Sequence, residues 1–198
     1  MAVFPGKNFL SPAALARFLL TAALLVGLDL WTKVIAFDRL AVHDSAGRLV
    51  FGERGQLVAK APYALIPGWL EFTVTTNRGA VFGMLEGYGP AFVIVSVVAI
   101  VVLSYMFAWS ENQRLYQVIL GMLLAGVLGN LYDRLKFGYV RDMIKGLPQW
   151  PNLFPWIFNI ADSLLCTGVG LLLIHTLMFH TEHKKPKPDG AEPDKARA

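Results

Sequence analysis

Four long apolar stretches limit what this chain can fold into more than any other feature of its sequence. They cover residues 13–35, 88–110, 115–132 and 156–179. The hydrocarbon core of a bilayer is about 30 Å thick, and a helix needs roughly 20 residues to cross it. The second and third stretches contain no charged residue. We therefore expect an all-α membrane protein in which these stretches form a bundle of four transmembrane helices.

The composition excludes several classes of soluble protein. Hydrophobic residues make up 55% of the 198 residues and charged residues only 16%, whereas an average soluble domain is about 25% charged. The net charge is +4, but basic residues outside the C-terminal tail are scattered and form no stripe, so we expect no nucleic-acid partner. Cys166 is the only cysteine, and no Cys/His cluster has metal-ligand spacing. We therefore expect no internal disulfide, no metal and no cofactor.

The first apolar stretch also resembles the hydrophobic region of a secretory signal peptide. A basic segment precedes it, and the uncharged run 18–28 has the length of such a region. The run leads directly into Asp29, Trp31 and Lys33 rather than into a cleavage site of small residues. We therefore interpret residues 13–35 as a helix that spans the membrane.

An even number of spans places both termini on the same side of the membrane. The tail 181–198 is basic and rich in proline, so we expect it to be disordered and cytoplasmic. The loop 37–86 would then be periplasmic. Within it, residues 48–59 fit a hairpin around a turn bounded by Gly52 and Gly55, and residues 69–76 alternate like a strand. We expect residues 1–180 to form one membrane domain with a small β-element on the membrane surface.

Polar side chains gather at one level of the predicted bundle. Ionisable and amide groups inside a membrane are costly and by default mark a function. Nine such residues fall near the outer interface: Asp29, Lys33, Asn77, Asn130, Asp133, Arg134, Asp142, Asn159 and Asp162. Several pairs, among them Asp29 with Lys33 and Asn130 with Arg134, are three or four residues apart and project from one helix face. Because lipid does not tolerate them, we expect these faces to point into the bundle.

Asp142 and Asp162 are the strongest catalytic candidates in this layer. Two carboxylates that face each other at a site of low dielectric constant cannot both ionise cheaply, so the pair holds one proton. One aspartate can then activate water while the other protonates the substrate, without a metal or a covalent intermediate. This chemistry fits hydrolysis of a peptide bond at the membrane surface. The candidates to position the substrate and stabilise the oxyanion are Asn77, Asn130, Asn159 and Arg134.

Four blocks of the sequence resemble those of bacterial lipoprotein signal peptidases, the signal peptidase II family. The blocks are Asp29-Leu-Trp-Thr-Lys33, Asn77-Arg-Gly-Ala-Val-Phe-Gly83, Gly129-Asn-Leu-Tyr-Asp-Arg134 with Gly138-Tyr-Val-Arg-Asp142, and Phe158-Asn-Ile-Ala-Asp-Ser163. They occur in the order of the family and extend from the first span to the last. Each block alone is weak, but the four together are specific.

The resemblance implies an aspartyl endopeptidase of the bacterial inner membrane. Its substrate would be a diacylglyceryl-modified prolipoprotein, cut just before the lipidated cysteine, and its other partner would be membrane lipid, with the enzyme a monomer. Carried over residue by residue, the catalytic dyad is Asp142 and Asp162. The resemblance places Asn77, Gly79, Asn130, Arg134 and Asn159 in a supporting polar shell, and Asp29, Lys33 and Asp133 among the residues that hold the helices together.

Two other functions compete with this interpretation. A small proton-coupled transporter would use Asp29 to bind its cation and substrate, but it leaves Asp142 and Asp162 without a role. An intramembrane protease of the presenilin or prepilin-peptidase kind carries a Gly-x-Gly-Asp signature. Asp142 lacks that signature, because Gly138-Tyr-Val-Arg precedes it.

Overall fold

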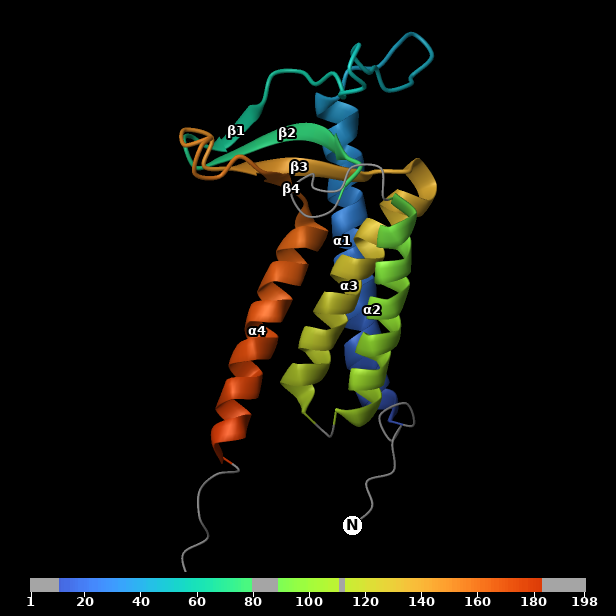
Figure 1. Cartoon of the computed structure of the whole chain (residues 1–198), viewed down its shortest axis with the longest axis vertical. Coiled ribbons are helices and arrows are strands. Elements are labelled where there is room, and N and C mark those ends of the chain that lie inside the picture. Colours follow the sequence, from blue (N-terminus) through green and yellow to red (C-terminus); the bar gives the residue numbers. More distant parts are fainter. Residues whose placement is uncertain (1–10, 80–88, 111–112, 183–198) are drawn as a thin grey trace, which may run out of the picture.

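The computed structural model describes residues 11–79, 89–110 and 113–182. Within these ranges the chain forms four long helices, with a small sheet across one end of the bundle (Figure 1). The helices are α1 (Pro12–Leu40), α2 (Gly89–Trp109), α3 (Arg114–Phe137) and α4 (Ile160–Glu182). The strands are β1 (Tyr63–Ile66), β2 (Leu70–Asn77), β3 (Val140–Gly146) and β4 (Ile157–Phe158). The expected combination of four apolar helices and a small sheet is confirmed.

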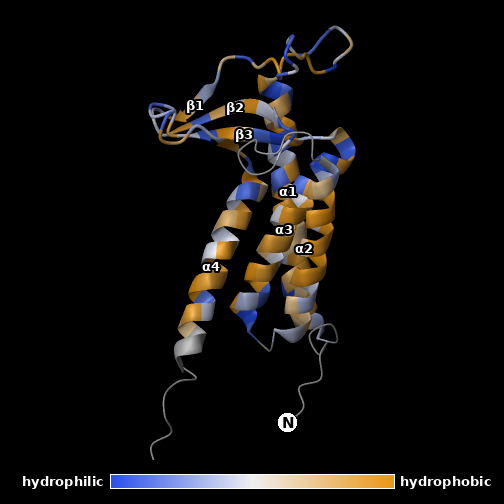
Figure 2. Cartoon of the chain, in the orientation of Figure 1, coloured by the Kyte–Doolittle hydropathy of each residue, from blue (hydrophilic) through white to orange (hydrophobic). Residues whose placement is uncertain are grey.

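Each of the four helices is long and apolar enough to cross a membrane. In the most apolar part of α3, 61% of the residues are buried, against 22% in α1 and 17% in both α2 and α4. The helix α3 is therefore central, and the other helices turn broad apolar surfaces outward. Figure 2 shows hydrophobic residues dominating the middle of the helices, with more hydrophilic residues toward their ends and in the sheet. Apolar side chains on the outside are the pattern expected of helices surrounded by lipid.

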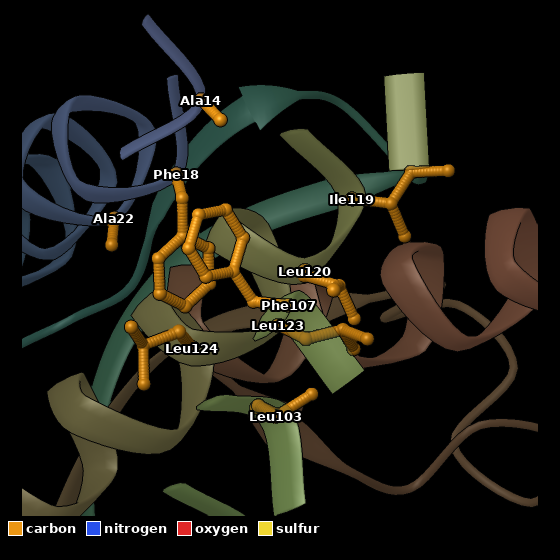
Figure 3. Packing of buried hydrophobic residues seen from close by; sticks show 9 residues of the cluster. All are labelled: Ala14, Phe18, Ala22, Leu103, Phe107, Ile119, Leu120, Leu123 and Leu124. Carbon is orange, nitrogen blue, oxygen red and sulfur yellow. The ribbon is translucent and has the colours of Figure 1, made fainter. Parts of the chain in front are cut away.

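The half of the bundle away from the sheet is held by an apolar cluster of α1, α2 and α3. The rings of Phe18 and Phe107 stack with their centroids 4.4 Å apart. Leu120, Leu123 and Leu124 of α3 pack around them (Figure 3). The cluster itself contains no charged residue, and beside it Nε of Arg17 in α1 donates to Oε1 of Gln117 in α3 at 2.9 Å.

The sheet is antiparallel throughout, in the order β1-β2-β3-β4. Its β3 strand follows α3 directly, since Gly138 ends the helix with a φ of +79° and donates its N–H to the carbonyl of Arg134. This left-handed conformation suits glycine. The register pairs Asp142 of β3 with Thr75 of β2. The strand therefore carries Asp142 across the end of the bundle.

Three helix ends lie four or five residues from the ends of the predicted spans. The helices α1 and α3 continue to Leu40 and Phe137, each five residues past the predicted ends at 35 and 132, because their last turns pack beside the sheet rather than in lipid. Ala36 of α1 belongs to a second apolar cluster that includes Val74 and Met143 of the sheet. The fourth helix starts at Ile160 rather than at 156, because the two residues of β4 pair with β3.

Loop 41–62, between α1 and β1, lies beyond the sheet (Figure 1). Its expected turn is present, since the N–H of Gly55 donates to the carbonyl of Gly52 at 2.9 Å. The flanking residues form isolated antiparallel bridges, such as Phe51 with Leu57, rather than long strands. The basic tail expected to be disordered lies, from residue 183 on, outside the described residues.

Candidate active site

Asp142 is a buried carboxyl group at the junction of sheet and bundle. Only 1% of the residue is exposed, and its Oδ1 accepts a hydrogen bond of 2.6 Å from Nδ2 of Asn159. The pKa of Asp142 is raised to about 7, mainly by burial and also by the negative charge of Asp162. Hydrogen bonds from Asn159 and Asn77 lower the pKa, but by less. Asp142 therefore keeps its proton up to near-neutral pH.

Asp162 is held in the first turn of α4 by a reciprocal pair of hydrogen bonds. The backbone N–H of Asn159 donates to Oδ2 of Asp162 at 3.2 Å, and the backbone N–H of Asp162 donates to Oδ1 of Asn159 at 2.9 Å. Side chains three residues apart that cap a helix start in this way form a capping box. The start of α4 therefore fixes the direction of Asp162.

Two asparagine amides join the aspartates into one network. Nδ2 of Asn130 donates to Oδ1 of Asp162 at 2.8 Å, and Nδ2 of Asn159 donates both to Asp142 and, at 3.2 Å, to Oδ1 of Asn130. The network combines β3, α3 and α4, so it forms only when all three elements are in place. The structure thus brings Asp142 and Asp162, 20 residues apart in the chain, into one hydrogen-bonded network.

Lys33 lies beside this network and sets the orientation of Asn130. Its Nζ donates to Oδ1 of Asn130 at 3.2 Å. A lysine ammonium group has only donors, so the amide oxygen of Asn130 faces Lys33 and its NH₂ group faces Asp162. Lys33 therefore connects α1 to the two aspartates.

The same lysine forms a buried ion cluster with two aspartates. Nζ of Lys33 lies 2.8 Å from Oδ2 of Asp29 and 3.2 Å from Oδ2 of Asp133, and all three side chains are fully buried. Oδ1 of Asp29 accepts the backbone N–H of Ala161 at 2.8 Å, which ties α1 to the start of α4. Oδ1 of Asp29 thus contacts α4, while its Oδ2 pairs with Lys33 of the same helix. This arrangement favours the helix-joining role over the cation site that a transporter would need.

Arg134, Asn77 and Gly79 form a second group next to the network. One terminal nitrogen of Arg134 donates to the carbonyl of Gly79 at 3.3 Å, and the Gly79 N–H donates to Oδ1 of Asn77 at 3.0 Å. A cavity of about 470 Å³ opens here, with Asn77, Arg134, Pro90 and Tyr139 in its wall. This volume lies in the range of about 300–1,000 Å³ usual for ligand pockets. The rest of the Asn77 block, residues 80–83, lies outside the described residues.

Arg141 is a member of this polar layer that sequence reasoning missed. It is 6% exposed, and two of its guanidinium nitrogens donate to Oδ1 of Asp133 at 3.1 and 2.8 Å. The available signal was an arginine in a strand next to Asp142. Among the residues that the structure describes, no three His, Cys, Asp or Glu side chains are grouped to hold a metal ion. The described polar layer is therefore built from carboxylates, amides and cations.

Comparison with known proteins identifies the family of this chain. The family model described as signal peptidase (SPase) II matches residues 21–178. The chain belongs to the signal peptidase II family. As a member of that family with four membrane-spanning helices, it is a peptidase and a multi-pass bacterial membrane protein.

Individual signal peptidase II relatives and solved structures agree with this assignment. The lipoprotein signal peptidase of Enterococcus faecalis is 34% identical over 174 residues, which cover 87% of this chain and 95% of the relative. The lipoprotein signal peptidase of Alteromonas mediterranea is 34% identical over 182 residues, which cover 89% of this chain and 87% of the relative. A solved bacterial membrane enzyme matches with a TM-score of 0.65 and 32% identity, over 86% of this chain and 93% of that one. A second solved bacterial membrane enzyme matches with a TM-score of 0.60 and 33% identity, over 80% of this chain and 90% of that one.

Proposed function

We propose that this signal peptidase II is an aspartyl endopeptidase that uses Asp142 and Asp162 as its catalytic dyad. The observation that carries the proposal is the hydrogen-bonded network in which Asn159 and Asn130 join the two carboxyl groups. A pair of carboxylates that shares one proton supplies both a base and an acid. No cofactor is needed for that chemistry.

In this mechanism Asp142 holds the proton and Asp162 acts as the base. The raised pKa of Asp142 supports that assignment, and so does the greater exposure of Asp162, which is only half-buried. Asp162 takes a proton from water as the water oxygen bonds to the scissile carbonyl carbon, and Asp142 gives its proton to the carbonyl oxygen. When the C–N bond breaks, the proton on Asp162 passes to the leaving amine and the proton on the oxygen returns to Asp142.

Arg134 and Asn77 are placed to hold the substrate backbone and the developing oxyanion. Arg134 is a cation in the wall of the cavity, and its guanidinium carbon lies 5.2 Å from the centre of the Phe92 ring, which limits its motion. Donors fixed before the reaction stabilise the transition state without having to reorganise. Asn130 and Asn159 orient the aspartates themselves, while Gly79 supplies the carbonyl that positions Arg134.

The substrate we infer is a prolipoprotein that already carries a diacylglyceryl group on the cysteine after the cleavage site. The similar proteins of Enterococcus faecalis and Alteromonas mediterranea are lipoprotein signal peptidases, and a lipid-anchored substrate meets this polar layer at the edge of the bilayer. We propose that the sheet end of the bundle is periplasmic and that both termini lie in the cytoplasm. The enzyme then works as a monomer in the inner membrane.

The proposal is tested with the purified protein in lipid nanodiscs and a pair of synthetic prolipoprotein peptides. One peptide carries a diacylglyceryl group on the cysteine, and its partner is identical but has a free cysteine. Mass spectrometry of the products should show a single cut immediately before the modified cysteine. The free-cysteine peptide should stay intact. Equal cleavage of both peptides, or a cut elsewhere, would contradict the proposed substrate.

A further inference from the structure

Arg141 donates three hydrogen bonds to the carboxylate of Asp133. Its backbone N–H donates to Oδ2 at 3.0 Å, and its Nε and one terminal nitrogen donate to Oδ1. Oδ2 of Asp133 also receives Lys33 at 3.2 Å. Asp133 therefore lies between a strand cation and a helix cation, and the two share its charge.

The charges of this buried cluster balance only when Arg141 is included. Asp29 and Asp133 contribute two negative charges, and Lys33 and Arg141 contribute two positive charges. Without Arg141, one ammonium group would face two buried carboxylates. The uncompensated charge of Asp133 would attract Lys33, because an unpaired buried charge is costly. The contact that Lys33 would then lose is its hydrogen bond to Asn130.

We propose that Arg141 is a positioning residue for the dyad: it neutralises Asp133 and so leaves Lys33 in place to hold the amide of Asn130 toward Asp162. The inference rests on the proposed function, since it concerns the same two aspartates. Arg141 acts through four contacts in series: its own with Asp133, then Asp133 to Lys33, Lys33 to Asn130, and Asn130 to Asp162. Arg141 itself is not a catalytic residue, because it contacts Asp133 rather than the dyad.

The guanidinium group of Arg141 lies against the ring of Phe137, and Phe51 of loop 41–62 reaches that ring through Tyr139. The ring of Phe51 contacts Tyr139 edge to face at 6.4 Å, and Tyr139 stacks on Phe137 at 6.0 Å. The Arg141 guanidinium carbon lies 4.5 Å from the centre of the Phe137 ring. Stacking on an aromatic face suits the planar guanidinium group and keeps water from the ion pair. The loop thereby helps Arg141 stay paired with Asp133.

This role makes the charge of Arg141 visible in the pH dependence of the enzyme. Among the residues that the structure describes, the charged groups of this polar layer are Asp29 and Lys33 of α1, Asp133 and Arg134 of α3, and Arg141 of β3. Loss of one positive charge from this set stabilises the protonated forms of the dyad. The dyad then keeps its single proton up to a higher pH than in the wild type. Removing Arg141 should therefore move the whole pH–rate profile upward.

The test compares Arg141→Met, which removes the charge, with Arg141→Lys, which keeps it. We expect Arg141→Met to lower kcat at least about tenfold and to leave KM nearly unchanged. Both the acidic and the alkaline limb of the plot of kcat/KM against pH should move to higher pH by about 1 unit. Arg141→Lys should restore most of kcat and the original profile. Arg48→Met is the matched control, because it removes an arginine from an exposed ion pair with Asp44 in loop 41–62. The control should stay within about twofold of the wild type.

A double variant without either charge shows whether Arg141→Met loses activity only because the protein unfolds. Asp133→Asn combined with Arg141→Met removes both charges, so Lys33 has no second carboxylate to attract it. The double variant should recover kcat and the wild-type pH profile relative to Arg141→Met. If Arg141→Met keeps the wild-type kcat and profile, or if neither the double variant nor Arg141→Lys recovers activity, the inference is wrong. Asp142→Asn in the same assay tests the dyad separately, since an active Asp142→Asn would overturn the proposed function whatever Arg141 does.

Discussion

The two aspartates differ most in how far water reaches them. Asp142 is almost fully buried, whereas Asp162 is half-buried at the start of α4. The charged form of a carboxyl group loses most from burial, which is why the pKa of Asp142 rises to about 7. In the proposed mechanism, this difference in burial makes Asp142 of β3 the general acid and Asp162 of α4 the general base.

The pKa of Asp142 leads to a prediction for the pH dependence of the wild-type enzyme. Below a pH of about 7 Asp142 keeps its proton, and above that value Asp142 becomes ionised. The acid is then lost, so kcat/KM should fall as pH rises through about 7 and beyond. Steady-state kinetics in nanodiscs between pH 4 and 10 measure this decrease of kcat/KM at alkaline pH. A rate that still increases at pH 9 would contradict the assigned proton.

The residues of the polar layer were predictable from sequence to different degrees. Asn130, Asn159 and Asp162 stand out because a polar group in an apolar stretch has a cost that a function must justify. Arg141 was missed, because a strand outside the spans carries no such cost in the sequence. Its burial, and its pairing with Asp133, arise only when β3 crosses the end of the bundle.

The close approach of α1, α3 and α4 positions these side chains. A Cβ atom added to Gly129 of α3 would overlap Oδ2 of Asp29 and lie 3.2 Å from Cβ of Ala161. Only glycine leaves room there for the ion pair of Asp29 and Lys33 against α3. Asn130 lies on α3 and Asp162 on α4, and Asn159 directly precedes α4.

Gly129→Ala should therefore impair both folding and catalysis. We expect the free energy of unfolding to fall by about 1–3 kcal/mol, as in other overpacked cores, and activity to fall with it. Gly170→Ala in α4 is the matched control, since a Cβ atom there meets nothing within 4 Å. Thermal unfolding in nanodiscs and peptidase assays check both variants. Equal melting temperatures for the two variants would contradict the packing argument.

Helices were easier to predict than their ends or the sheet partners. Hydropathy locates a span because lipid demands apolar side chains, but it does not mark where a helix continues past the bilayer, as α1 does to Leu40. The strand β2 was predictable from its alternation. The two residues of β4 were not, because pairing with β3 depends on chain segments brought together only by the fold.

On the scale of the whole molecule, the sheet and the polar layer occupy one end of the bundle. The helix α1 begins and α4 ends at the other end (Figure 1). This arrangement agrees with an even number of spans, because the first helix begins and the last helix ends on the same side. In the proposed orientation the candidate site faces the periplasm.

Cysteine labelling in whole cells tests this orientation. In a Cys166→Ser background, which removes the exposed natural thiol, Arg54→Cys marks loop 41–62 and Gln113→Cys marks the opposite end of the bundle. A membrane-impermeant maleimide should label Arg54→Cys in cells with a permeable outer layer and an intact inner membrane. Gln113→Cys should react only after the inner membrane is opened. The reverse pattern would show that the sheet lies in the cytoplasm.

The most direct test of the central claim is the single-turnover rate of Asp142→Asn and Asp162→Asn on the lipidated peptide. Each variant keeps the shape of its side chain but loses the acid or the base, so the cleavage rate should fall at least about 100-fold with the protein still folded. Asp44→Asn, which changes a half-buried carboxylate of loop 41–62 that pairs with Arg48, should cleave at the wild-type rate. If either dyad variant cleaves as fast as the wild type, Asp142 and Asp162 do not form the catalytic pair.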